Sequence, residues 1–306
     1  MYEYYIGMDV GGTHVRIAYK KSNEQSYSKI IKKKFVRCET VTEELEKNII
    51  QLIDYVIKIN SQGKLVGIGI AMAPLIDKKT GVIKEWPNNI KWREVPILDL
   101  LKSTYGIDVV IEDDANAAAL GEKLVGNAIN KENFIYVTIS TGIGCAIVLN
   151  NRLLVGEHGW CGELGHIRVS NSTERCNCGA TGCLQAIASG PAILKYYKNI
   201  TGIQNVSLNE IANEAMNGKK EAVQVINEAT QNIGLAISNL VILLDISLII
   251  IGGGVLNLGN IFIRCLEKEI YTNLFQRRQV ELKYSQLTDV NGVYGAIAII
   301  MDRMKK

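Results

Sequence analysis

Residues 4–19, YYIGMDVGGTHVRIAY, are the stretch from which the expected fold follows. The apolar run Tyr4–Asp9 is followed by glycines and then by a second apolar run, Val15–Tyr19. Two short apolar runs joined in this way predict a β-hairpin, with Gly11 and Gly12 at its tip. Glycine lets backbone N–H groups come close to a phosphate, and the Thr13 hydroxyl adds another donor. Taken alone, the same residues fit a plain hairpin turn equally well.

The second half of the chain repeats this arrangement. Strand Phe134–Ile139 is expected to lead through the turn Ser140–Gly144 (STGIG) into strand Cys145–Leu149. Two such units about 130 residues apart predict a duplicated domain, whose two glycine turns can hold one polyphosphate from opposite sides. Asp9, at the end of the first strand, can hold Mg²⁺ through water because hard cations prefer oxygen ligands. The sequence has neither a Walker A nor a GxGxxG pattern, which excludes P-loop enzymes and typical dinucleotide binders.

Strands and helices alternate along the rest of the chain, which predicts an α/β fold with helices covering the sheets. The further strands expected are Ser28–Arg37, Leu65–Ala71, Val109–Glu112 and Leu248–Ile251, and the helices expected are Thr42–Ile59, Val95–Tyr105, Asp114–Leu124, Gly190–Thr201, Leu208–Ala215, Ala222–Leu244, Ile261–Phe275 and Gly292–Met304. Thr42 is the expected N-cap of its helix. Leu235–Leu256 is apolar but broken by Asp245 and three glycines, so we interpret it as a buried helix and strand, not a membrane span.

Composition narrows the class of protein. The chain has 306 residues, which favours two domains, and its 47% of apolar residues excludes general disorder. The 34 basic and 31 acidic side chains leave a net charge of +3, which provides no electrostatic case for nucleic acid or an anionic membrane as a partner. No signal-peptide pattern is present, so a cytoplasmic protein is expected.

Three adjacent acids, Glu112, Asp113 and Asp114, are expected where a strand ends and a helix begins. Ligands of α/β proteins bind at such strand ends. One carboxylate at this place can take a proton from a substrate hydroxyl. The alternative is an acidic helix N-terminus without a catalytic role.

Four of the seven cysteines lie within residues 161–183. In a cytoplasmic chain such crowding favours a metal over disulfides. One imidazole and three thiolates, a tetrahedral set that zinc favours in structural sites, are available from His166, Cys176, Cys178 and Cys183. The alternative is a group of reduced, buried cysteines. Cys161 is spare, and Glu163 stands close enough to His166 to reach the same place.

Two features have no single interpretation. Gly252–Gly254 follows an expected strand and can admit a flat ligand such as adenine, or can form a close-packed turn. Trp86, Trp92 and Trp160 can supply a platform on which a sugar stacks, although tryptophans more often belong to the core.

Together these motifs resemble the ROK family of repressors, open reading frames and sugar kinases. The resemblance extends from Tyr5 to the last helix and is carried by Asp9–Thr13 (DVGGT), Glu112–Glu122 (EDDANAAALGE), Thr141–Gly144 (TGIG), Gly162–His166 (GELGH), Cys176–Gln185 (CNCGATGCLQ) and Gly252–Val255 (GGGV). It implies a two-lobed actin-like, ribonuclease H-like fold with a central cleft. The implied small lobe is residues 1–114 with the returning helix 291–306, and the larger lobe, 115–290, carries the zinc loop.

The resemblance also implies an activity, an ATP-dependent hexose kinase that transfers the γ-phosphate to the sugar 6-hydroxyl, with Asp114 as catalytic base. The implied contacts to ATP and Mg²⁺ are Asp9, Gly11, Gly12, Thr13, Thr141, Gly142, Gly144, Gly253 and Gly254. The implied sugar contacts are Asn88, Asp113, Asp114, Glu163, His166 and Gln185, and the implied zinc ligands are His166, Cys176, Cys178 and Cys183.

The identity of the sugar is less sharply indicated. Gly11–Arg16, Gly162–Ile167 and Asp289–Gly292 most resemble D-allose kinases, so D-allose is the first candidate. Glucokinase and N-acetylmannosamine kinase activities are the alternatives, and a non-catalytic sugar-binding regulator is an alternative of another class. No helix-turn-helix segment is expected ahead of residue 9. The family pattern has Asn where this chain has Asp113 and Glu where it has Gln185, which argues against a direct transfer of glucose specificity. The family also implies a homo-dimer or tetramer.

Overall fold

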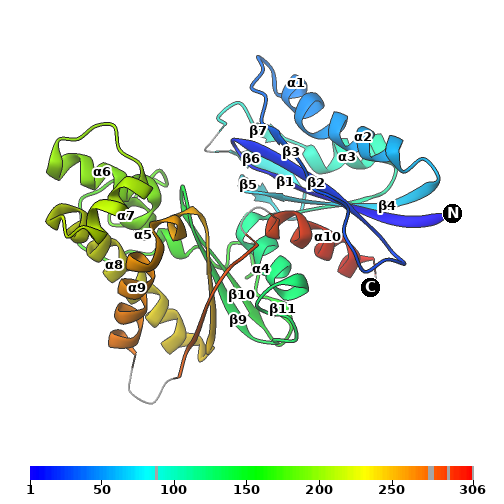
Figure 1. The fold of residues 1–306 in the computed structure, drawn as a ribbon. Helices are drawn as coiled ribbons and strands as arrows, with labels where there is room; N and C mark the ends of the chain where they lie inside the picture. Colours follow the sequence, from blue (N-terminus) through cyan, green and yellow to red (C-terminus); the bar gives the residue numbers. More distant parts are fainter. Residues whose placement is uncertain (87–88, 275–278, 288–289, 305–306) are drawn as a thin grey trace. The chain divides into compact units, whose positions relative to one another are not determined.

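The computed structural model describes residues 1–86, 89–274, 279–287 and 290–304 (Figure 1). These residues form two compact α/β units. Unit 1 comprises residues 1–130 and 289–306, and unit 2 comprises residues 131–288. Each unit has its own five-stranded sheet and its own large apolar core.

The sheet of unit 1 has the strand order β3-β2-β1-β4-β8. Its strands are β1 Tyr2–Val10, β2 His14–Lys21, β3 Ile31–Lys34, β4 Gly63–Met72 and β8 Asp108–Asp113. β1 and β2 form the predicted hairpin, in which Val10 pairs with Val15 and the Gly11 N–H donates to His14 O over 3.0 Å. β4 and β8 run parallel to β1.

A second, three-stranded sheet in unit 1 was not predicted. It consists of β5 Leu75–Asp77, β6 Val82–Glu85 and β7 Arg93–Val95. Strands of only 3 or 4 residues are too short for an alternating pattern to stand out from a loop. Trp86 and Trp92, which lie between β6 and β7 along the chain, are fully buried in the core with their rings edge to face at 5.2 Å. Of the three tryptophans only Trp160, 57% exposed, can meet a ligand from solvent.

The helix predicted over residues 42–59 is present as three segments that follow one another directly, α1 Val41–Leu45, the π-helical η1 Glu46–Ile50 and α2 Gln51–Ile59. Its N-cap is Thr40, and the prediction of Thr42 was wrong. Thr40 Oγ1 accepts the Glu43 N–H, and the Glu43 carboxylate accepts the Thr40 N–H. This capping box requires an acidic or amide side chain three residues after the hydroxyl, and Leu45 follows Thr42 at that spacing.

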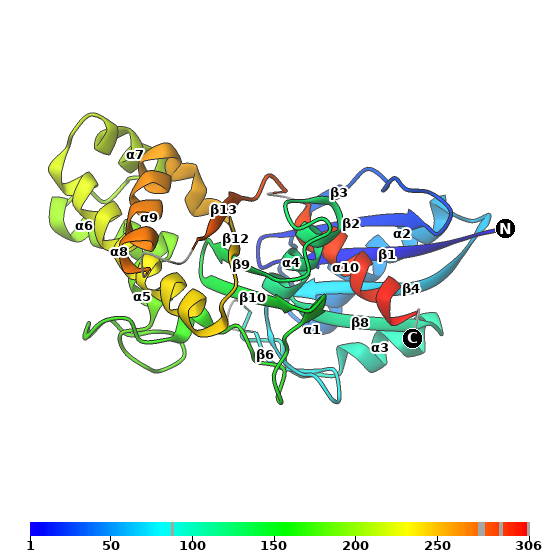
Figure 2. The ribbon, with the colours of Figure 1, turned by 90° about the horizontal axis from the view of Figure 1, so that it is seen from below.

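The last helix, α10 Asn291–Arg303, returns to unit 1 and packs against β1, β4 and α4 Asp114–Val125 (Figure 2). A Cβ at Gly69 would lie 1.8 Å from Ala296 O, and one at Gly295 would lie 1.6 Å from Ala117 O. Backbones this close leave room only for glycine. α4 packs tightly against α10, and the compact unit 1 extends to residue 130, whereas the lobe implied by the resemblance ends at residue 114. α3 Ile97–Tyr105 completes unit 1.

Unit 2 repeats the sheet topology of unit 1, with the order β11-β10-β9-β12-β13. Its strands are β9 Phe134–Ile139, β10 Ile143–Leu149, β11 Arg152–Leu153, β12 Leu248–Gly252 and β13 Glu281–Tyr284. In both units an antiparallel hairpin is extended on one side by two parallel strands. The predicted duplication is therefore visible in the topology.

Helices cover the apolar core of unit 2. They are α5 Leu184–Ala188, α6 Gly190–Thr201, α7 Leu208–Met216, α8 Lys220–Leu244 and α9 Gly259–Asn273, with the short 3₁₀ turns η2 Leu164–His166 and η3 Gly254–Leu258. As predicted, the apolar stretch 235–256 is divided between the end of α8 and β12. Within the described residues, no helix has the length and apolar character to cross a membrane.

Candidate functional site

The tip of the first hairpin is closed by its own backbone. Because the Gly11 N–H donates to His14 O, that N–H closes the turn, while the Thr13 side chain is exposed. Asp9, at the end of β1, accepts a hydrogen bond from Arg16 Nη1 at 3.0 Å. A Cβ at Gly292 would lie 3.1 Å from Asp9 Cγ, so the start of α10 packs directly on Asp9. Sequence reasoning identified Asp9 but missed these two neighbours, which come from β2 and from the far end of the chain.

The three acids at the end of β8 differ in what they do. Asp113 is the N-cap of α4, and its Oδ1 accepts the backbone N–H groups of Ala115 at 3.0 Å and Asn116 at 3.4 Å. Glu112 Oε1 accepts from the Asp113 N–H at 2.9 Å, from the Asn116 side-chain amide at 3.1 Å and from Lys78. These bonds and the positive end of the helix dipole offset the repulsion between the carboxylates.

Asp114 is the first residue of α4, and it is exposed. The first turn of α4 is fixed by the hydrogen bonds that Asp113 and Glu112 accept from it. The arrangement therefore presents one carboxylate to solvent on a fixed backbone, which is what a general base requires. Lys78 was missed by the sequence reasoning, because the contact joins residues 34 positions apart.

In unit 2 the turn after β9 lies beside the glycine turn after β12. Gly253 has φ +97°, and a Cβ there would lie 2.2 Å from Ile139 O, at the end of β9. A Cβ at Gly254 would lie 3.7 Å from Ser140 Oγ. The Gly190 N–H, at the start of α6, donates to Ser140 O over 2.9 Å. Gly253 thus forms a close-packed turn beside the end of β9, where Ser140 and Thr141 are exposed.

Unit 2 also has a hollow of about 530 Å³ that was not predicted. It is lined by Asn209, Ala212, Asn213, Met216, Asn257, Leu258 and Gly259, which come from α7, η3 and the start of α9. Asparagine amides and apolar side chains together suit a flat, polar-edged ring system. A second hollow of similar size, about 510 Å³, lies elsewhere on unit 2 along α8, and it contains none of the expected site residues.

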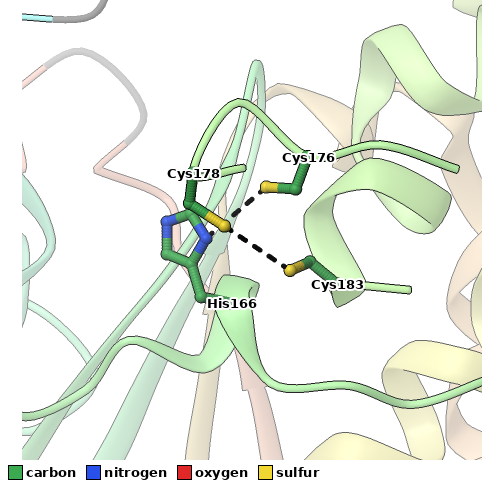
Figure 3. A group of neighbouring side chains, drawn as sticks. All are labelled: His166, Cys176, Cys178 and Cys183. Atoms are coloured by element: carbon green, nitrogen blue, oxygen red, sulfur yellow. Dashed lines mark hydrogen bonds between the residues drawn. The ribbon is translucent and has the colours of Figure 1, made fainter. Parts of the chain in front are cut away.

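His166, Cys176, Cys178 and Cys183 converge as the sequence predicts (Figure 3). Their ligand atoms all lie within 4.8 Å of one another. Cys178 Sγ is 3.7 Å from Cys183 Sγ, and Cys176 Sγ is 3.5 Å from His166 Nδ1. A tetrahedral zinc ion with ordinary bond lengths would place two sulfurs about 3.8 Å apart, and sulfur and nitrogen about 3.6 Å apart. The Cys178–Cys183 and Cys176–His166 pairs therefore already have the spacing of a tetrahedral zinc site.

The loop that carries the cysteines depends on glycine. Gly179 has φ +90° and Gly182 has φ +74°, both in the left-handed region. A Cβ at Gly182 would also lie 2.6 Å from Ser170 O. The Cys176 N–H donates to Ala180 O at 2.8 Å, which closes the loop around the sulfurs.

The protein environment shifts the pKa values of two of the cysteines in opposite directions. Burial alone would raise the pKa of Cys176, but hydrogen bonds with the backbone of Cys178 and with the side chains of Gln185, Cys178 and His166 lower it to about 7. Burial, and then hydrogen bonds with Cys178 and Cys176, raise the pKa of Cys183 to about 12. Since a thiol must lose its proton to ligate, an ion in this cluster would bind with release of protons.

Glu163 and His166 stand side by side at the edge of the cluster. Glu163 Oε2 lies 3.7 Å from His166 Nε2, while His166 Nδ1 faces Cys176. Glu163 is 61% exposed. Just before it, Gly162 has φ +98°, and a Cβ there would lie 2.1 Å from Cys145 O, so the GELGH segment is held tightly on β10.

Gln185, which the resemblance makes a sugar contact, borders the cysteine cluster. Its Nε2 donates to Cys176 Sγ at 3.4 Å. Asn88, another expected sugar contact, lies outside the described residues. Cys161 is not part of the cluster.

The comparisons with known proteins agree with this geometry. Residues 5–303 match the ROK family, and the chain belongs to that family. Its fold is the two-lobed, actin-like ATPase fold of ROK kinases.

Among its relatives is a glucokinase of Thermotoga maritima, 28% identical over 98% of each chain. A predicted xylose repressor of Caldicellulosiruptor sp. is 30% identical over 80% of this chain, which spans 64% of the repressor's length. Among solved structures, the ROK hexokinase from Thermus thermophilus superposes with a TM-score of 0.88 at 27% identity, covering 99% of this chain and 100% of the hexokinase. A ROK glucokinase from Streptomyces griseus in complex with glucose and AMPPNP superposes with a TM-score of 0.77 at 29% identity, covering 97% and 98%.

Proposed function

We propose that this protein is an ATP-dependent hexose kinase that transfers the γ-phosphate of ATP to a sugar 6-hydroxyl. The observation that carries the proposal is the start of α4, where Asp113 and Glu112 hold the helix and leave Asp114 exposed. Family membership supports the same activity, because glucokinases and a hexokinase are among the relatives. A xylose repressor is also among them, so the activity itself must be measured.

In this mechanism Asp114 accepts the proton of the sugar 6-hydroxyl as that oxygen forms a bond to the γ-phosphorus. The bond between the γ-phosphorus and the bridging oxygen breaks, and ADP leaves with the electron pair. In phosphoryl transfer, positioning and charge neutralisation provide most of the rate enhancement. A base on the rigid first turn of a helix therefore suits the reaction better than one on a loop.

The nucleotide is assigned to the glycine turns. In unit 1 the groups are Asp9, Gly11, Gly12 and Thr13, and in unit 2 they are Thr141, Gly142, Gly144, Gly253 and Gly254. Mg²⁺, bound with ATP, would neutralise phosphate charge, and the Asp9 carboxylate is the oxygen ligand that fits it through water. The hollow lined from α7, η3 and α9 is large enough for a purine, and its asparagine amides can bond the ring edge.

The sugar is assigned to Asp113, Asp114, Glu163 and His166, with Asn88 from the undescribed segment. D-allose is the first candidate because of the motifs that resemble D-allose kinases, with glucose and N-acetylmannosamine as alternatives. A structural zinc ion is proposed for His166, Cys176, Cys178 and Cys183. With Nδ1 on the metal, His166 keeps its proton on Nε2, from which it can donate to Glu163 or to a sugar hydroxyl.

A coupled assay for ADP release, run with ATP-Mg²⁺ and a panel of D-allose, D-glucose, D-mannose and N-acetylmannosamine, tests the proposal. We expect turnover with at least one hexose and the highest kcat/KM for D-allose. Asp114→Asn keeps the shape of the side chain but accepts a proton poorly, so kcat should fall about 10²–10⁴-fold. Asp99→Asn, at an exposed acid in the first turn of α3, is the matched control and should leave kcat unchanged.

The outcome that contradicts a kinase is equally clear. If the zinc-loaded, folded protein binds a sugar in calorimetry but releases no ADP with any sugar of the panel, a sugar-responsive regulator replaces the kinase. Wild-type turnover in Asp114→Asn would leave a kinase but remove Asp114 from its mechanism. A higher kcat/KM for glucose than for D-allose would leave the kinase and overturn the choice of sugar.

A further inference from the structure

Gln185 lies where three motifs of unit 2 meet. It is the second residue of α5 and follows directly on Cys183 and Leu184. Its Nε2 donates to Cys176 Sγ at 3.4 Å, which is within hydrogen-bond range for sulfur. Its Oε1 lies on the side of Gly142 and Gly165, since a Cβ on either glycine would be 3.1 Å from that oxygen. One amide therefore borders the cysteine loop, the turn after β9 and the GELGH segment.

An amide at position 185 suits the cysteine cluster, because its N–H is donated to Cys176 Sγ. Glutamine has a donor at one side and an acceptor at the other, whereas glutamate, when ionised, has acceptors only. Three thiolates and one zinc ion leave a formal charge of −1 on the cluster. An N–H donated to one of the sulfurs stabilises that charge, and a carboxylate at the same distance repels it. The side chain at 185 is thus matched to a negatively charged metal cluster.

We propose that Gln185 is a positioning residue that secures the metal loop to the start of α5 through its N–H···S bond to Cys176. This role rests on the zinc ion assigned above, and it does not depend on kinase activity. It also gives a reason why this chain has Gln185 where the family pattern has glutamate. The glutamine N–H is donated to a sulfur of the cluster, and the sugar site has one carboxylate fewer.

The test is the rate at which the purified full chain releases zinc to an excess of a colorimetric chelator. Gln185→Glu keeps the shape but replaces the donor with an acceptor, and Gln185→Met fills similar space with neither. Removing a residue that hydrogen-bonds a metal ligand, without itself binding the metal, typically lowers metal affinity about 10–100-fold. We expect both variants to release zinc at least about 10-fold faster than wild type, with Gln185→Glu the faster of the two. Gln231→Glu, which makes the same charge change on the exposed side of α8, should release zinc at the wild-type rate.

A spectroscopic measurement separates this role from loose folding. With Co²⁺ in place of zinc, loss of an N–H···S bond raises the energy of the sulfur lone pairs, so the sulfur-to-cobalt absorption should move to longer wavelength in both variants. Unchanged zinc release and an unchanged cobalt spectrum would overturn the proposal, as would a wild-type protein without zinc. Wild-type metal behaviour together with a raised KM for the sugar would instead establish the direct sugar contact. If one of the two Gln185 variants does not fold, the other variant decides the test. A wild-type protein that binds zinc but has no kinase activity would refute the kinase and leave this test valid.

Discussion

Replacing Asp113 with alanine should destabilise unit 1 by about 1 kcal/mol, because the side chain is the N-cap of α4. Its Oδ1 accepts the Ala115 N–H at 3.0 Å, an ordinary hydrogen bond, and the Asn116 N–H at 3.4 Å, which is long. One good bond and one weak bond place the loss near the middle of the range of about 0.5–2 kcal/mol that such caps show. Alanine can accept neither N–H, so both donors would turn to water.

Asparagine provides the matched comparison, since it caps helices about as well as aspartate does. Asp113→Asn should stay within a few tenths of a kcal/mol of wild type, with only the interaction of the charge with the helix dipole removed. A loss of about 1 kcal/mol lowers the melting temperature of a domain of this size by about 2–4 °C. Urea unfolding of the three proteins at pH 7, followed by circular dichroism, gives the free energies directly.

Two results would refute the reasoning. If Asp113→Ala is as stable as wild type, the side chain does not cap α4. If Asp113→Asn loses as much as Asp113→Ala, the charge matters and the hydrogen bonds do not. A raised KM for the sugar in Asp113→Asn, at unchanged stability, would add a sugar contact to the capping role.

Three other changes test the rest of the structure. Gly295→Ala should cost at least about 1–3 kcal/mol by urea unfolding, because its Cβ would lie 1.6 Å from Ala117 O, and wild-type stability would contradict the close packing of α10. The pKa of buried Glu44 is raised by burial but is lowered overall from 4.5 by hydrogen bonds from Trp92, from the Cys38 backbone and from Asn89. Its contribution to stability is therefore present above about pH 4.5 and is lost as the pH falls through its folded value; Glu44→Gln should be less stable than wild type at pH 7 by about 1.5–3 kcal/mol, and the difference should shrink between pH 5 and 3. Cys176→Ser should lose the metal measured by atomic absorption and lower the melting temperature, whereas equal metal content would exclude this sulfur as a ligand.

Most elements of the fold follow from patterns within a single segment. The hairpin at 4–19 has two apolar runs and a glycine tip, so its strands and its turn are both decided locally. The long α8 and the buried β12 are likewise recognisable from their apolar spacing. The three-stranded sheet β5-β6-β7 was missed because strands this short have no periodicity, and they are stabilised by pairing with one another.

The N-terminus of the helix at 41–59 shows how a local rule can be applied at the wrong residue. Thr40 and Thr42 are both acceptable caps by type, and only the Glu43 carboxylate three residues after Thr40 distinguishes them. This spacing in the sequence is sufficient to place the N-cap at Thr40.

In the candidate site, too, some features follow from a single segment of the sequence and others from contacts between distant segments. The convergence of His166 and the three cysteines was predictable, because they lie within 18 residues of one another and glycines with positive φ close the loop between them. The bond of Lys78 to Glu112, the packing of Gly292 on Asp9, and the hollow lined from α7, η3 and α9 join segments that are distant along the chain. No local pattern in the sequence marks such contacts.

By itself, then, the sequence determined the ROK family, the two hairpins with their glycine turns, the acid triplet at a strand end and the four residues of the His–Cys cluster. These properties depend on residue type and short spacing, since φ preferences, apolar periodicity and ligand chemistry act over a few residues. Only the tertiary structure decided that Asp113 and Glu112 hold α4 while Asp114 is exposed, that α4 belongs with α10, and that Gln185 donates to Cys176. Each of these depends on which strands pair and how closely the backbones approach. That is set by burying the apolar surface of a whole unit, and no single segment contains it.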